Sequence, residues 1–234
     1  MIRNELEFRD LVARLLEKES FSVQKEFKLP EGYRVDLLAI KNNERSGIEV
    51  KLERRGISDD ISKGMTLHTM PEFDYIYVAA PKIIISPELV FYAKQLRIGI
   101  IGVIDENSIE WLQKSEKLRP ARLSGGGSLP GQVRTPGSIF EVEKSVRNDG
   151  EKVIRHLEMF FIPSGPFVTA PREKSRFKLA KLSPGETWKG KFKIKIKKTA
   201  KTGTYPLYLS CIAHNLQPSD DVWNILVNYD TAIK

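Results

Sequence analysis

The chain has 234 residues, of which 41% are hydrophobic, and a formal net charge of +8. No apolar run reaches the ~18–20 residues of a membrane-spanning helix, and the first residues alternate charged with apolar side chains, unlike a signal peptide. The single cysteine, Cys211, excludes an internal disulfide and a cysteine-based zinc site. We therefore expect a soluble, cytoplasmic protein with no membrane partner.

The positive charge is concentrated in the second half of the chain. Residues 1–120 carry 19 Lys and Arg against 20 Asp and Glu, whereas residues 121–234 carry 19 against 10. Such an excess indicates an anionic partner, of which nucleic acid is the commonest, although an anionic membrane surface would produce the same pattern. Charge alone does not choose between them.

The first half predicts alternating strands and helices. An amphipathic helix is expected over residues 5–20, where leucines recur at helical spacing. Further helices are expected over 58–70 and 86–97, and strands over 22–29, 33–40, 46–53, 73–80 and 98–104. Because the last strand is apolar on both faces, the pattern predicts helices covering a mixed sheet, an α/β/α sandwich over residues 1–120.

The second half predicts an all-β domain. Residues 124–137, SGGGSLPGQVRTPG, break every period, so we expect a Gly/Pro/Ser linker over residues 121–137. Short strand-like runs separated by turn signals follow at 138–150, 153–163, 176–198, 203–213 and 223–229. Frequent strands without helical periodicity indicate an antiparallel β-sandwich over residues 138–234.

Three charged side chains interrupt the apolar strands of YRVDLLAIKNNERSGIEVKLE, residues 33–53. Glu49 and Lys51 point to one face of their strand while Val50 points to the other, and a hairpin can bring Asp36 beside them. Paired carboxylates with a lysine suit metal-assisted phosphodiester hydrolysis, because carboxylate oxygens hold Mg²⁺ while phosphate and water complete its coordination. Alternatively, Lys51 pairs with Glu49 or Glu53 on a solvated edge strand.

Around these residues, the first half resembles the PD-(D/E)xK nuclease superfamily, in particular the Mrr-like restriction endonucleases and their archaeal junction-resolving relatives. The likeness rests on the helix FRDLVARLLEKESF, the strand bearing Asp36, the EVK of residues 49–51, and the tail FDYIYVAAPK…ELVFYAKQLRIGIIGVIDENSIEWL. It implies a restriction-endonuclease-like fold in which Asp36, Glu49 and the carbonyl of Val50 bind Mg²⁺ or Mn²⁺. It also implies that Lys51 serves the attacking water.

Two positions depart from the family pattern. Val35 stands where a proline often precedes the aspartate, and Arg9 stands where the first helix often carries a glutamate. Glu5 lies one helical turn before Arg9 on the same face and is expected to replace that glutamate, with Glu7 as the alternative.

Basic residues near the motif and in the second half are candidates for DNA contact. Arg54, Arg55 and Lys63 follow the motif and could touch phosphate, or could be ordinary solvated side chains. In KGKFKIKIKK, the lysines Lys191, Lys193 and Lys195 share one face of a strand and the apolar residues share the other. This lysine stripe could follow a phosphate backbone, or could keep the sandwich soluble and block edge pairing.

The stretch LSPGETWKGKFKIKIKKTAKTGTYPLYLSCIA, residues 182–213, is similar to Ig-like sandwiches of the cell-adhesion-related and fibronectin-like type. The prediction for the whole chain is therefore an α/β half followed by an all-β half. Its predicted function is a metal-dependent DNA endonuclease whose β-sandwich helps to bind substrate or a protein partner, with a homodimer allowed. The alternative is a catalytically inert nuclease-fold adaptor that binds nucleic acid or protein.

Overall fold

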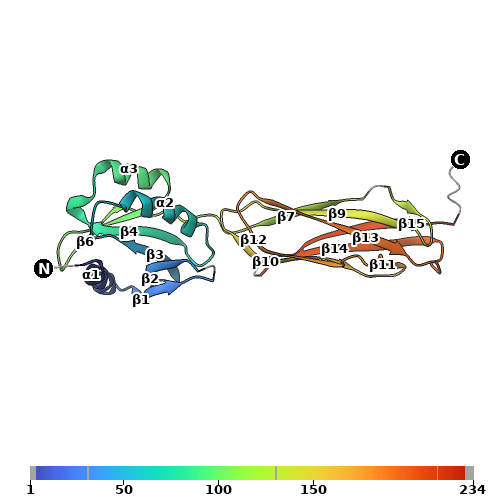
Figure 1. The fold of residues 1–234 in the computed structure, drawn as a ribbon, viewed down its shortest axis with the longest axis horizontal. Coiled ribbons are helices and arrows are strands. Elements are labelled where there is room, and N and C mark those ends of the chain that lie inside the picture. Colours follow the sequence, from blue (N-terminus) through green and yellow to red (C-terminus); the bar gives the residue numbers. More distant parts are fainter. Residues whose placement is uncertain (1–3, 31, 130, 215, 230–234) are drawn as a thin grey trace. The chain divides into compact units, whose positions relative to one another are not determined.

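The computed structural model describes residues 4–30, 32–129, 131–214 and 216–229 (Figure 1). The chain divides into two compact units, Met1–Arg119 and Pro120–Lys234, with the division beside the expected end of the first domain at residue 120. None of the helices in the described residues is long and apolar enough to cross a membrane.

The described part of the first unit contains one sheet and three α-helices. The helices are α1 (Glu5–Lys18), α2 (Ile57–His68) and α3 (Pro87–Gln95), with a 3-10 turn η1 (Lys82–Ile84) before α3. The strands are β1 (Ser22–Lys28), β2 (Arg34–Lys41), β3 (Glu44–Val50), β4 (Tyr75–Pro81), β5 (Gly99–Val103) and β6 (Ile109–Gln113). They lie in chain order across the sheet, with β3, β4 and β5 parallel and the outer pairs antiparallel.

Alternation along the strands divides the core of this unit between the two faces of the sheet. Ile48 and Val50 pack with the apolar side of α1, whereas Val78 packs with Ile57 and Ile61 of α2 on the other face. Figure 1 shows α1 and α2 on opposite sides of the sheet. β2 and β3 are joined by a two-residue turn in which both asparagines have positive φ, 54° and 63° at residues 42 and 43. This tight turn fixes the register of the two strands that carry the predicted motif.

The predicted fold class is wrong. The chain was expected to begin with a restriction-endonuclease-like α/β/α sandwich, but its described residues are mostly β, with fifteen strands in three sheets beside three α-helices of 14, 12 and 9 residues. The outer strands of the first sheet, β1 and β6, contain no buried residue, so the helices leave both edges of the sheet uncovered. Each stretch of sequence with apolar residues at helical spacing forms one short helix, and these helices do not form a layer that covers a whole face of the sheet.

The second unit is an Ig-like β-sandwich, as predicted. Its strands in the described residues are β7 (Leu123–Ser128), β8 (Val133–Arg134), β9 (Ile139–Asn148), β10 (Ile154–Ile162), β11 (Phe167–Thr169), β12 (Arg176–Leu182), β13 (Thr187–Ile196), β14 (Gly203–Ile212) and β15 (Ser219–Val227). One sheet has the order β12-β10-β14-β15-β8 and the other has the order β11-β13-β9-β7. All pairings are antiparallel except β15 with β8. Alternate residues of both sheets form one apolar core.

The segment expected to be a linker, residues 121–137, belongs to the sandwich. It contains β7, which pairs with β9, and β8, which pairs with β15. Its glycines allow close packing rather than flexibility: a Cβ on Gly127 would lie 2.4 Å from the ring of Trp223, and one on Gly125 would lie 2.5 Å from Ser219 Oγ. The Gly-rich composition therefore signals a strand crossed closely by side chains of the other sheet.

A buried ion pair crosses the interior of the sandwich. The side chain of Lys144, on β9, is fully buried, and its Nζ lies 2.5 Å from Asp221 Oδ2 and 3.3 Å from Ser219 Oγ on β15. Since β9 and β15 belong to different sheets, this contact links the two sheets at one register.

Candidate functional site

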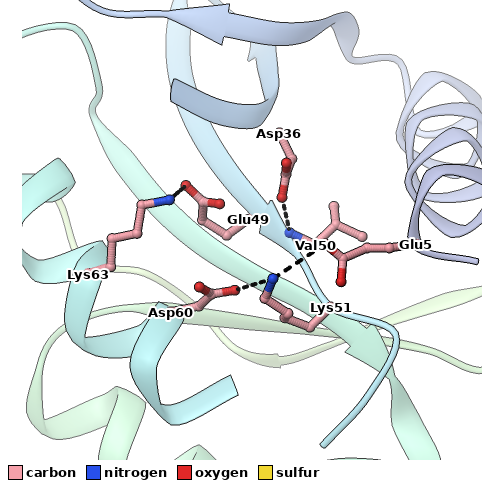
Figure 2. A network of polar contacts seen from close by, with 7 residues as sticks. All are labelled: Glu5, Asp36, Glu49, Val50, Lys51, Asp60 and Lys63. Carbon is pink, nitrogen blue, oxygen red and sulfur yellow. Dashed lines mark hydrogen bonds and ion pairs between the residues drawn. The ribbon is translucent and has the colours of Figure 1, made fainter. Parts of the chain in front are cut away.

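The predicted acidic residues meet where the start of β2 lies beside the end of β3. Leu37 pairs with Ile48, and just beyond this pair the backbone N–H of Val50 donates to Asp36 Oδ2 at 2.8 Å. Glu49 points away from the Val50 side chain, toward α2 (Figure 2). The structure thus brings Asp36, Glu49 and Val50 together, as the motif predicts.

Glu49 is a carboxylate held in the interior. It is 4% exposed, and Lys63 of α2 donates to its Oε1 at 2.9 Å. Burial raises the pKa of Glu49 to about 7; the Lys63 ammonium opposes this rise, and the Asp36 and Asp60 carboxylates add to it. Near neutral pH, Glu49 can therefore either hold a proton or carry charge.

Lys51 lies between two further carboxylates. Its Nζ is 3.3 Å from Glu5 Oε1 at the start of α1 and 3.6 Å from Asp60 Oδ2 on α2 (Figure 2). Burial acts to lower the pKa of Lys51, but the charges of Asp60 and Glu5 outweigh it and raise the pKa, so the side chain stays cationic. The structure places Glu5 in the cluster, whereas the backbone N–H of Glu7 is bonded to the Asn4 cap of α1.

Asp60 is a site residue that sequence reasoning missed. It is 9% exposed, its Oδ2 accepts no hydrogen bond within the described part of the chain, and burial raises its pKa. Gly56, with φ of 93°, turns the chain into α2 and so returns Asp60 and Lys63 to the end of β3. Their spacing of three residues, which places both on one face of a helix, was the available signal.

The oxygen atoms of this cluster fit a hard divalent cation. The described residues contain no group of three or more His, Cys, Asp or Glu side chains that could hold a metal ion by themselves. Mg²⁺ commonly uses one or two carboxylates and completes its octahedron with water and phosphate, which Asp36, Glu49 and the Val50 carbonyl allow. The buried Asp60 oxygen that accepts no hydrogen bond adds a potential acceptor nearby.

One cavity adjoins the cluster. It has a volume of about 580 Å³ and is lined by Glu5, Lys51, Arg55 and Asp60 among others, whereas Arg54 lines a separate cavity of about 520 Å³. Arg54 and Arg55 are exposed, as a phosphate contact requires. Lys63, predicted to face DNA, instead forms the ion pair with Glu49 described above.

The lysine stripe of β13 has the predicted alternation, with Phe192 and Ile194 buried between exposed lysines. Yet carboxylates accompany the stripe. Lys191 Nζ lies 3.1 Å from Glu141 Oε1, and Lys193 Nζ lies 3.0 Å from Glu173 Oε1. Lys195 is half-buried at the end of the strand. These ion pairs reduce the positive potential that the stripe can offer a phosphate backbone.

Comparisons with known proteins assign no family. No family model matches the chain, and no curated protein matches it. Three similar solved structures are native alpha-2-macroglobulin from Escherichia coli (14% identity, TM-score 0.36), the CARDB domain of a Pyrococcus furiosus protein (13%, 0.32) and Spo0M, the sporulation control protein of Bacillus subtilis (14%, 0.32). The match to alpha-2-macroglobulin covers 45% of this chain and 6% of that protein, and the match to the CARDB domain covers 47% of this chain and 90% of that domain. The match to Spo0M covers 46% of this chain and 49% of Spo0M.

The expected resemblance to the PD-(D/E)xK nucleases is therefore wrong as a family assignment. No family model matches the chain, and its described residues are mostly β, with fifteen strands beside three α-helices. The misleading signal was the triplet of Asp36, Glu49 and Lys51, which is short enough to recur by chance in unrelated sequences.

Proposed function

We propose that the chain is a metal-dependent endonuclease that hydrolyses phosphodiester bonds in DNA. The observation that carries the proposal is Glu49, a buried carboxylate with a pKa of about 7 that lies near Asp36 and Asp60 and is paired with the Lys63 ammonium. A buried, strongly perturbed carboxylate beside specific charge partners is typical of a catalytic site rather than of a solvated surface.

Each residue has a distinct role in this proposal. Asp36 and Glu49 would hold Mg²⁺ or Mn²⁺ with the Val50 carbonyl. A bound ion of this kind polarises a phosphate and lowers the pKa of a coordinated water. Lys51, held cationic by Glu5 and Asp60, would stabilise the negative charge that develops on the phosphate.

Substrate access is supported by the surroundings of Lys51. The cavity of about 580 Å³ beside it opens next to Arg55, an exposed cation that could bind the phosphate backbone. In this proposal the sandwich assists by binding DNA or a protein partner, because the excess positive charge lies in its half of the sequence.

The test is a cleavage assay on plasmid, branched and single-stranded DNA with Mg²⁺, Mn²⁺ or EDTA. We expect cleavage with either metal, none with EDTA, and a loss of at least 100-fold in Asp36→Ala, Glu49→Ala and Lys51→Ala. Glu17→Gln, which changes an exposed carboxylate toward the end of α1 opposite Glu5, is the matched control and should cut like the wild type. A wild type that cuts no DNA with either metal, or a fully active Lys51→Ala, would refute the proposal.

A second candidate is a catalytically inert adaptor that binds nucleic acid or protein. The ion pair of Lys63 with Glu49 favours it, because it balances the buried carboxylate without a metal. For this candidate, the same assay would show no cleavage with any metal, and a separate gel-shift measurement would show DNA binding that is indifferent to metal.

A further inference from the structure

A third cavity in the first unit lies at the other end of β3 from the acidic cluster. It has a volume of about 410 Å³, within the range of small-molecule sites. The acidic cluster follows the end of β3, whereas this cavity uses Glu44 and Ser46 at its start. Ser46 also precedes Ile48 and Val50 on the α1 face, so the cavity opens on the opposite face of the sheet from Glu49.

The cavity exists because α1 ends at Lys18 and leaves this end of the sheet to aromatic side chains. Trp111 lies in its wall: the ring centroid lies 6.0 Å from that of Phe21, tilted by 32°, and 5.0 Å from that of Tyr77, edge-on. Gly99 makes room for Tyr77, because a Cβ there would lie 2.1 Å from the tyrosine ring. Phe21 and Trp111 are only half-buried, so part of each ring surface stays accessible from the cavity side.

The polar groups of the cavity form two sets. Lys41 and Lys114 supply positive charge: Lys41 Nζ donates to the Glu19 carbonyl at 2.7 Å and lies 4.9 Å from the Phe21 ring centroid, and neither lysine has a carboxylate partner among the described residues. Glu19 and Glu44 supply hydrogen-bond acceptors, and an aromatic side chain donates a hydrogen bond to each carboxylate and so fixes its orientation. Trp111 Nε1–H donates to Glu19 at 3.0 Å, and Tyr75 O–H donates to Glu44 at 3.2 Å.

Ser46 adds a hydroxyl to this wall. The residue is 6% exposed and lines the cavity, so its side chain offers a donor and an acceptor to a polar ligand there.

We propose that this cavity binds a nucleotide, with the base against Trp111 and Phe21 and the phosphate at Lys41 and Lys114. A planar heterocycle matches the half-buried rings, since bases stack on aromatic side chains. The carboxylates of Glu19 and Glu44 accept hydrogen bonds from an exocyclic amino group, which favours adenine, guanine or cytosine over uracil. The cationic ends bind phosphate. This site is independent of the endonuclease function proposed above.

The nucleotide could be free or the phosphorylated end of a strand. Isothermal titration calorimetry on the full chain in EDTA, with adenosine 5′-monophosphate as the probe, tests the shared chemistry, while ribose 5-phosphate and uridine 5′-monophosphate serve as comparisons. We expect the adenine nucleotide to bind at least tenfold more tightly than ribose 5-phosphate. A 5′-phosphorylated pentanucleotide that binds tighter than the mononucleotide assigns the site to a strand end, and equal affinities assign it to free nucleotide.

Substitutions at Lys114 and Trp111, with Lys94→Gln as the control, locate the binding. Lys114→Gln should weaken nucleotide affinity about tenfold, whereas Lys94→Gln, an exposed lysine on α3 with no ion pair among the described residues, should leave it unchanged. Trp111→Leu should weaken stacking by roughly tenfold, and Trp111→Phe, which keeps a ring, should lose less. No binding at ~1 mM probe, equal affinity for ribose 5-phosphate, or unchanged affinity in folded Lys114→Gln and Trp111→Leu would overturn the proposal.

Discussion

Replacing Glu49 by glutamine should change how the stability of the first unit depends on pH. When folding raises the pKa of an acid, there is a pH range between the unfolded and the native pKa values. In that range the native protein keeps the proton and the unfolded protein has lost it. Between 4.5 and about 7, the native state therefore holds one more proton at Glu49, and stability falls as pH rises. Above pH 7 both states are ionised, and this loss becomes constant.

The size of the loss follows from the two pKa values. The interval from 4.5 to about 7 corresponds to about 2.5 pH units, and each unit is worth ~1.36 kcal/mol, which gives about 3 kcal/mol. Glu49→Gln keeps the shape of the side chain and cannot ionise. We therefore expect the variant to match the wild type near pH 4.5 and to exceed its free energy of unfolding by about 3 kcal/mol at pH 8.

The assay is urea unfolding in EDTA, followed by circular dichroism at 222 nm from pH 4.5 to 8. This signal reports on the first unit, because all three α-helices of the described residues lie in it. Glu53→Gln is the matched control and should run parallel to the wild type. If the Glu49→Gln profile also runs parallel to the wild type, Glu49 is not held in a desolvated environment and the reasoning fails.

Three further changes test other contacts. Asp60→Asn should weaken Mg²⁺ binding at least tenfold by calorimetry, because it removes the buried charge next to the proposed ligands; unchanged affinity would exclude Asp60 from the site. Lys144→Met should destabilise the sandwich by about 3–5 kcal/mol in urea unfolding, since it leaves Asp221 unpaired, and a loss under ~1 kcal/mol would contradict this. Gly127→Ala should lower the thermal midpoint of the sandwich, because its Cβ would overlap the Trp223 ring, and an unchanged midpoint would show that β7 can move aside.

Side-chain alternation was the most informative property of the sequence. It placed Phe192 and Ile194 in the core with the lysines outside, and it separated Glu49 from Val50, because a strand has only two faces. The Asn42–Asn43 turn was recognisable from residues that tolerate positive φ. These features are local, so one sequence is enough to reveal them.

Features that depend on distant partners could not be derived in the same way. Gly127 was interpreted as flexible because its packing partner, Trp223, lies almost a hundred residues away in the chain. Asp60 was overlooked because its burial depends on how α2 returns to β3. The ion pair of Lys193 with Glu173 was equally invisible, since it joins β13 to a loop that carries no signal of its own.

Because side chains of β3 alternate between two different environments, the number of residues in this strand can change only by an even number without exchanging its two faces. Ser46, Ile48 and Val50 must face α1, while Gly47 and Glu49 must face α2, where a Cβ on Gly47 would lie 2.8 Å from Ile76. Deleting or inserting one residue within the strand exchanges the two sets and drives Glu49 into the apolar layer beneath α1. In an insertion scan of the gene, single-residue changes between Glu44 and Val50 should therefore be eliminated, whereas two-residue changes, which restore the alternation, should survive more often.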